Sequence, residues 1–89
     1  MTLDERAATL ARELRPLVAR SMSDRQLMVA DATLDAGEGY EALKWLFDAA
    51  ETPGIIIPEP LLDGIRDCIQ PEDMEEYASI IADQARRNR

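Results

Sequence analysis

The chain of 89 residues contains no histidine and only one cysteine, Cys68. Histidine is the commonest general base and metal ligand near neutral pH, so its absence removes the usual basis of hydrolytic and metal sites. A lone cysteine cannot form an internal disulfide. Cys68 also continues an apolar stripe with Ile65 and Ile69, which indicates a small buried side chain. We therefore expect no enzyme, no cofactor and no metal site.

Aromatic residues and long apolar runs are scarce as well. The chain has one Trp, one Phe and two Tyr, and no stretch approaches the roughly 18 apolar residues of a membrane span. The N-terminal sequence MTLDERAATLARELRP lacks the basic start and apolar block of a secretory signal. The sequence therefore predicts a soluble, cytoplasmic protein with no membrane among its partners.

Apolar residues recur at steps of three and four along most of the chain, which is the spacing of α-helices. A chain of 89 residues can build one core, so residues 1–89 are expected to form a single helical domain. The sequence predicts a compact all-α bundle of about five short helices with an extended Ile-rich connector at 55–58, for which an edge strand is the alternative interpretation. The expected helices cover residues 3–20, 24–36, 39–51, 59–69 and 71 onward.

Local signals place the boundaries of these helices. Thr2 with Glu5 and Ser23 with Gln26 have the spacing of capping boxes. Pro16 interrupts the hydrogen bonding of the first helix and should kink it, and residues 86–89 are expected to fray. The expected buried positions of the second helix are Leu27, Met28, Ala30 and Leu34, and those of the last are Met74, Tyr77, Ala78 and Ile81.

The helix at 39–51 is expected to lie at the centre of the bundle, because it holds most of the aromatic residues. Its apolar stripe consists of Tyr40, Leu43, Leu46, Phe47 and Ala50. At about 100° per residue, Trp45 points to the opposite side. Two interpretations follow: Trp45 packs in the core under the first or last helix, or it is presented to a partner.

Acidic residues are concentrated in the middle of the chain. Residues 31–76 contain thirteen Asp and Glu against Lys44 and Arg66, a net charge of −11, whereas the whole chain carries −8. Such a surface disfavours nucleic acid and anionic membranes as direct partners and favours a basic protein.

Several of these acids repeat at helical spacing, where like charges repel by a few tenths of a kcal/mol per pair. The simplest interpretation is a solvated polar face. The alternative is a binding face, because clustered charge accelerates association with an oppositely charged protein, and a Trp among such charges is a natural anchor. The candidate partner-binding residues are Asp31, Asp35, Glu38, Glu41, Trp45, Asp48 and Asp63.

The run DAGEGYEALKWLFD at 35–48, followed by IIIP at 55–58 and LLDGI at 61–65, resembles the MafI-type immunity proteins of polymorphic toxin systems. The resemblance covers residues 33–70. It implies a small cytoplasmic protein that binds and neutralises the toxic domain of a cognate contact-dependent or secreted toxin, often a ribonuclease. A nuclease site must be basic to hold phosphate, so an acidic, non-catalytic domain suits such a partner.

The first hypothesis is therefore an immunity protein that binds the basic toxic domain of a bacterial toxin. A second is a small acidic regulatory adaptor or nucleic-acid mimic that occupies a nucleic-acid-binding protein. A third is an acyl carrier protein, which needs an exposed serine directly after an acid at a helix start. Here Asp24 follows Ser23, and Ser23 is better interpreted as a helix cap. The oligomeric state is not indicated by the sequence.

Overall fold

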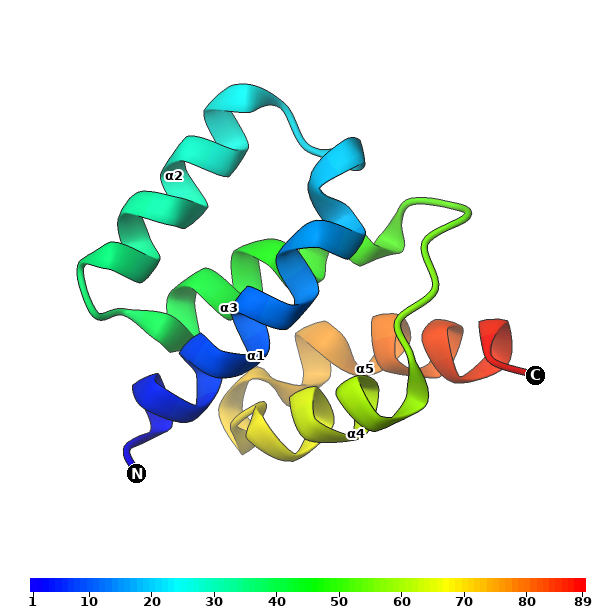
Figure 1. The fold of residues 1–89 in the computed structure, drawn as a ribbon. Coiled ribbons are helices and arrows are strands. Elements are labelled where there is room, and N and C mark those ends of the chain that lie inside the picture. The colour runs from blue at the N-terminus through cyan, green and yellow to red at the C-terminus, as the bar shows by residue number, and fades with distance from the viewer.

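The computed structural model describes residues 1–89 and contains five α-helices and no strand (Figure 1). The all-α prediction is therefore confirmed. The helices are α1 (Leu3–Val18), α2 (Asp24–Asp35), α3 (Gly39–Asp48), α4 (Glu59–Cys68) and α5 (Pro71–Arg87), with 3₁₀ turns at Ala19–Ser21 and Ala49–Glu51.

Helices α1 and α3 pack against each other in the middle of the molecule, with α2 on one side and α4 and α5 on the other (Figure 1). Helix α3 contacts both α1 and α2, and the 3₁₀ turn that continues it contacts α5. Its predicted central position is therefore confirmed. No helix of the bundle combines the length and the apolar character needed to cross a bilayer.

Both predicted capping boxes are present, at Thr2 with Glu5 and at Ser23 with Gln26. Helix α1 continues through Pro16 and tightens into a 3₁₀ turn after Val18, so the α-helix ends two residues before the predicted limit. This change follows from the missing N–H of Pro16, which removes a hydrogen bond from the last turns.

The beginning of α3 is fixed by α1. The Asp4 carboxylate accepts a hydrogen bond of 3.0 Å from the backbone N–H of Tyr40 and so caps α3 from the neighbouring helix. A Cβ atom on Gly39 would lie 2.1 Å from the backbone oxygen of Asp4. Only glycine therefore allows the two helices to approach so closely here.

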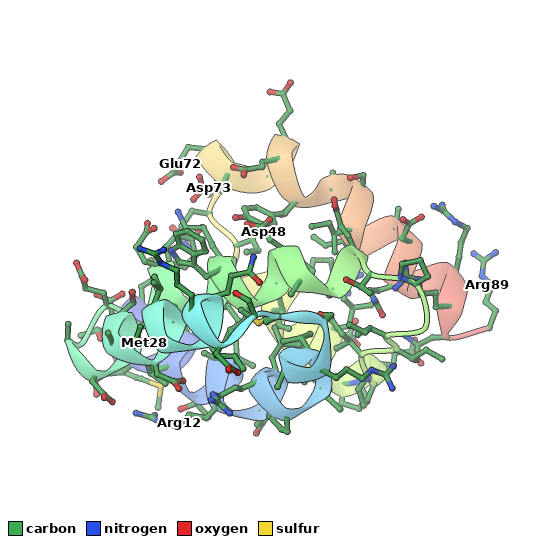
Figure 2. The ribbon with its side chains drawn as sticks, turned by 90° about the horizontal axis from the view of Figure 1, so that it is seen from above. Arg12, Met28, Asp48, Glu72, Asp73 and Arg89 are labelled. Atoms are coloured by element: carbon green, nitrogen blue, oxygen red, sulfur yellow. The ribbon has the colours of Figure 1, made fainter.

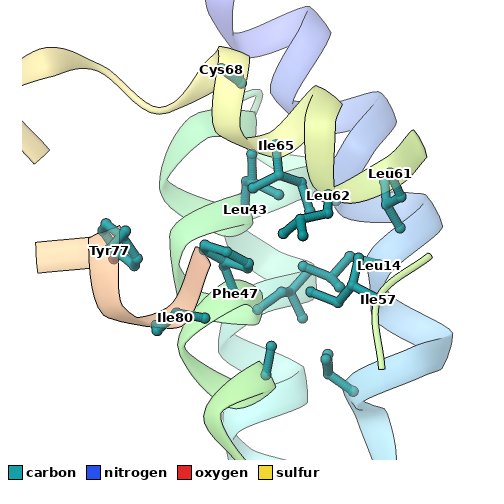
Figure 3. Packing of buried hydrophobic residues seen from close by; sticks show 14 of the residues in the cluster. Leu14, Leu43, Phe47, Ile57, Leu61, Leu62, Ile65, Cys68, Tyr77 and Ile80 are labelled. Carbon is teal, nitrogen blue, oxygen red and sulfur yellow. The ribbon is translucent and has the colours of Figure 1, made fainter. Parts of the chain in front are cut away.

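The core is formed by side chains from all five helices, with only Ala30 from α2, and from the Ile-rich connector (Figure 3). Phe47 of α3 lies at its middle, between Leu14 and Ile57 on one side and Tyr77 and Ile80 on the other. The rings of Phe47 and Tyr77 stack with centroids 5.9 Å apart. Cys68 is buried, as predicted, and burial raises the pKa of its thiol.

Two predicted apolar faces need correction. In α2 only Ala30 is buried and Met28 is 64% exposed, because α2 packs mainly against α3 and most of its surface stays uncovered. In α5 the expected Ala78 is exposed, whereas Ile80 and the uncharged polar residue Gln84 are buried. The buried face of α5 is thus shifted around the helix from the predicted one, and it places Gln84 in hydrogen-bond contact with the connector.

The connector runs across the core as an extended, unpaired segment, with Ile55 and Ile57 buried and Ile56 exposed. It is held by what we call the C-terminal latch, formed by Gln84, Arg87 and Asn88. The Gln84 side-chain oxygen accepts a hydrogen bond of 2.9 Å from the Ile57 N–H. Its side-chain nitrogen donates hydrogen bonds of 3.0 Å to the carbonyls of Ala50 and Ile55.

Arg87 and Asn88 complete the latch. The Arg87 guanidinium donates hydrogen bonds of 2.9 to 3.1 Å to the carbonyls of Ala50, Glu51, Thr52 and Ile55. The Asn88 amide donates to the Ile57 carbonyl at 2.9 Å. Residues 86–89 are expected to fray from the sequence; in the structure α5 continues to Arg87, and the side chains of Arg87 and Asn88 are bonded to the connector and to the turn before it.

Candidate protein-binding face

Trp45 lies on the surface of the central helix. Its side of α3 is opposite the buried residues Leu43 and Phe47, and 46% of its surface is exposed. The interpretation that Trp45 packs in the core is therefore wrong. Neither α1 nor α5 encloses it, although Glu76 and Tyr77 of α5 line a hollow beside it.

Two surface hollows flank Trp45, and Trp45 and Asp48 line both. The first, the α2–α3 hollow, has a volume of about 270 Å³ and is also lined by Met22, Gln26 and Thr52. The second, the α3–α5 notch, has a volume of about 240 Å³. Besides Trp45 and Asp48, it is lined by Glu41, Lys44, Glu76 and Tyr77.

We call this region the Trp45 face, defined by Trp45 and the residues that line the two hollows. Figure 2 views the molecule from above and shows Asp48 on α3, with Glu72 and Asp73 nearby at the start of α5. The face therefore combines one exposed aromatic side chain with carboxylates from two helices.

Asp48 forms none of the ion pairs of the chain, and only Lys44 and the Tyr77 hydroxyl favour its charged form. Partial burial, followed by repulsion from the carboxylates of Glu76 and Glu51, raises its pKa above the ordinary value. Lys44 is the only lysine of the chain, and it pairs instead with Glu41 at 2.9 Å and with Asp73 at 3.5 Å. Negative charge at Asp48 and Glu76 therefore stays unbalanced within the chain.

A second group of contacts fixes the geometry of the face. The Tyr40 hydroxyl donates a hydrogen bond of 2.6 Å to Asp73 and accepts one of 3.0 Å from the Gln70 N–H. The Lys44 ammonium lies 4.7 Å from the centre of the Tyr40 ring. Burial and the bond to Asp73 raise the pKa of Tyr40 to about 12. These contacts join α3 to the start of α5 and so set the width of the α3–α5 notch.

The structure brings together only part of the predicted set. Glu41, Trp45 and Asp48 share the Trp45 face. Asp35 and Glu38 are exposed near the end of α2, away from both hollows.

Asp31 and Asp63 lie in other surroundings. Two hydrogen bonds of 2.8 and 2.9 Å join Arg15 to Asp31, and they lower the pKa of that carboxyl. Asp63 pairs with Arg66 on α4, which packs against α1 on the side away from α2 (Figure 1). The charges of both residues are balanced locally, and their part in partner binding stays a prediction.

Sequence reasoning missed Glu76, Tyr77 and Gln26 as neighbours of Trp45. Glu76 was visible as part of the acidic run at 72–76, but nothing in the sequence placed that run beside α3. Gln26 was identified only as part of a helix cap. Its side chain also lines the α2–α3 hollow.

Other hollows lie elsewhere on the surface. One, of about 460 Å³, brings the predicted Asp31 and Asp35 together beside the exposed Met28, but Arg15 in it already pairs with Asp31. The largest hollow, of about 520 Å³, lies between the start of α1 and the end of α2, but its Asp4 and Glu5 are used in helix capping. No group of three or more Cys, Asp or Glu side chains is arranged to hold a metal ion. The exposed Trp45 with its uncompensated carboxylates therefore marks the candidate site.

Comparison of the chain with protein-family models, with curated proteins and with solved structures finds no match.

Proposed function

We propose that this chain is a cytoplasmic immunity protein that binds and neutralises the basic toxic domain of a cognate bacterial toxin, with a nuclease as the expected class. The observation that carries the proposal is the Trp45 face. There the only Trp of the chain is half exposed beside carboxylates that no basic residue of the chain neutralises. The resemblance of residues 33–70 to MafI-type immunity proteins supports the same proposal.

The chemistry of the face suits a basic protein partner. Trp and charged anchors dominate binding energy when they are desolvated at the centre of an interface, and unbalanced carboxylates gain most from a positively charged neighbour. A nuclease must present cations to bind phosphate. An acidic domain can occupy such a surface without any catalytic group of its own.

A specific interface would extend beyond the two hollows. A standard interface buries about 800 Å² on each partner, a minor part of the 5274 Å² of accessible surface of this chain. Val29 extends the face along α2, because it is exposed and lies one helical turn from Gln26. The interface would thus run from α2 across Trp45 to the start of α5.

The test uses the reading frame upstream of this gene. If it encodes a secreted protein with a variable C-terminal domain, that domain is purified and its affinity for the chain is measured, with growth of co-expressing cells as a second readout. We expect Trp45→Ala to weaken binding by about 2 kcal/mol, roughly 30-fold, and to slow growth of toxin-expressing cells.

Ile56→Ala is the matched control, since Ile56 is an apolar residue of similar exposure (52% against 46% for Trp45) that lies outside both hollows of the Trp45 face. Full affinity and full protection by the Trp45→Ala variant would overturn the proposal. A chain that is needed for growth without any neighbouring toxin would support the regulatory adaptor or nucleic-acid mimic instead.

A further inference from the structure

We infer that the outer side of α2 is a docking surface for a basic amphipathic helix of the partner protein. The inference rests on the proposed function and adds a second contact to the Trp45 face. It concerns what we call the outer α2 stripe, the exposed apolar residues on the side of α2 beyond which no other helix lies (Figure 1). The stripe consists of Met28, Val29, Ala32 and Ala36.

Helix α2 carries apolar residues on two opposite sides. Its inner side holds the buried Ala30 and the half-buried Leu34, which pack on the core. At about 100° per residue, Met28 and Ala32 point to the opposite side, where a solvated helix carries polar residues. Met28 is 64% exposed and Val29 39%, and they are two of the five large apolar side chains that the bundle leaves exposed. The core therefore does not account for the stripe, whereas its spacing is that of a face that docks on another helix.

A hollow of about 460 Å³ lies beside the stripe and extends to Arg15 of α1. Its apolar lining consists of Leu27, Met28 and Ala32, and its acidic lining of Asp24, Asp31 and Asp35. Packed helices lie about 8–10 Å apart, depending on the side chains at the contact. The small side chain of Ala32 therefore lets a partner helix approach α2 closely, with one row of its side chains in the hollow.

The acidic border of the hollow fits a basic partner. Asp31 is paired with Arg15. Asp24 and Asp35 take part in none of the ion pairs of the chain. Asp24 stands in the first turn of α2, where the helix dipole favours a carboxylate, but Asp35 is the last residue of α2, and no basic residue lies in that turn. The charge of Asp35 therefore disfavours its own helix and gains most from a cation of the partner.

A second copy of the chain is a poorer occupant of the stripe. Each copy carries a net charge of −8, so two copies repel each other. Helix α2 has 12 residues, a length of about 18 Å, and one side of so short a helix covers far less than the roughly 800 Å² that each partner buries in a stable interface. A basic partner that also contacts the Trp45 face, to which α2 contributes Gln26, has the remaining area available.

The experiment titrates the isotope-labelled full chain with a helical peptide of about 18 residues that has leucines on one side and lysines on the other. A peptide of the same pattern with glutamate in place of lysine is the comparison probe. We expect saturable chemical-shift changes with the lysine peptide, centred on the amides of residues 24–36 and on the Met28 methyl group, and none with the glutamate peptide. Changes that leave residues 24–36 unaffected would overturn the inference.

Two substitutions test the apolar and the acidic part of the surface separately. Met28→Gln keeps the length of the side chain but removes its apolar contact, and it should weaken binding of the lysine peptide about three- to tenfold. Ile56→Gln is its control, because Ile56 is an exposed apolar residue of the connector. Asp35→Asn should weaken binding about two- to fivefold, the range for a solvent-accessible ion pair.

Asp67→Asn is the matched control for Asp35→Asn. Asp67 is also an exposed carboxylate near the end of its helix, α4, and it also forms no ion pair, so its substitution should leave the titration unchanged. Equal weakening by the control variants, or unchanged binding by both α2 variants, would contradict the inference. A dimer of the free chain that Met28→Gln dissociates in analytical ultracentrifugation would assign the stripe to a second copy and would contradict it as well.

Failure of this inference can be told apart from failure of the proposed function. If Trp45→Ala weakens toxin binding but Met28→Gln does not, only the α2 contact is overturned. If the lysine peptide binds to α2 as expected but no toxin domain binds the chain, the outer α2 stripe remains a docking surface for a basic helix and the immunity function is overturned.

Discussion

At the scale of single residues, Asp48 is the position where stability and the proposed function oppose each other. Its carboxylate is partly buried and repelled by Glu76 and Glu51, and both effects disfavour the charged form. The opposite case is Asp31, whose charged form is favoured by two hydrogen bonds from Arg15. Removing the charge should therefore raise the melting temperature at Asp48 and lower it at Asp31.

We expect Asp48→Asn to raise the melting temperature at pH 7 by about 1–4 °C, which corresponds to a few tenths of a kcal/mol. Because the pKa of Asp48 is raised on folding, its ionisation penalises the folded state above that pKa, and the penalty disappears as the pH falls below the unfolded-state value. The increase in melting temperature given by Asp48→Asn should therefore disappear as the pH falls below the unfolded-state pKa of aspartate. Thermal unfolding followed by circular dichroism from pH 7 to pH 3 measures this.

Asp31→Asn is the matched control and should lower the melting temperature at pH 7. The pKa of Asp31 is lowered on folding, so its contribution is present above the unfolded-state pKa and is lost as the pH falls through the folded value. If both variants melted lower than the wild type at pH 7, the assignment of Asp48 as a destabilising charge would be wrong.

At the scale of the elements, the end of α5 stabilises a segment that has no hydrogen-bonding partner of its own. The connector forms no strand, yet its backbone groups at Ile55 and Ile57 are bonded by the C-terminal latch. This satisfies the rule that buried backbone groups need partners. Gln84 is central because it is the only member of the latch that is fully buried.

We expect Gln84→Leu to lower the free energy of unfolding by about 1–3 kcal/mol, the cost of leaving one buried polar group unpaired. The carbonyls of Ala50 and Ile55 keep hydrogen bonds from Arg87, so the orphaned group is the Ile57 N–H. Urea unfolding gives the free energy, and faster hydrogen exchange at residues 55–57 identifies the cause.

Arg86→Gln tests whether the effect is specific to the latch. Arg86 lies on the same turn of α5 but is exposed and pairs only with Asp83, so its substitution should change stability by less than about 0.5 kcal/mol. Equal losses in the Gln84 and Arg86 variants would mean that the latch does not stabilise the connector.

At the scale of the whole molecule, charge is distributed unevenly along α5 and around the bundle. Glu72 and Asp73 lie at one end of α5 and Arg89 at the other (Figure 2). The acidic end lies beside the Trp45 face. At the basic end, the Arg87 guanidinium is hydrogen-bonded within the C-terminal latch. A basic partner would therefore be attracted and oriented toward the Trp45 face.

This arrangement predicts a salt-dependent association rate with the toxin domain. Raising NaCl from 0.05 to about 0.5 M shortens the screening length to a few ångströms and should slow association about tenfold. The dissociation rate should change little. Stopped-flow measurements of Trp45 fluorescence give both rates. An association rate that does not depend on salt would contradict steering by the acidic surface.

The helices could be predicted from the amino-acid sequence, because apolar spacing, capping residues and prolines act over a few neighbouring positions. It thereby fixed the all-α class, both capping boxes and the central place of α3. It also showed that Trp45 faces away from the main apolar stripe, since that follows from helix geometry alone.

The neighbours of each helix face became known only from the packing of the whole chain. Whether Trp45 is covered depends on where α2 and α5 dock, and the bonding of Arg87 depends on a connector more than thirty residues away. Likewise, the sequence listed the acids at 72–76 but could not place Glu76 next to Asp48. Contacts between distant segments follow from how all helices bury their apolar surface together, and no local pattern encodes that result.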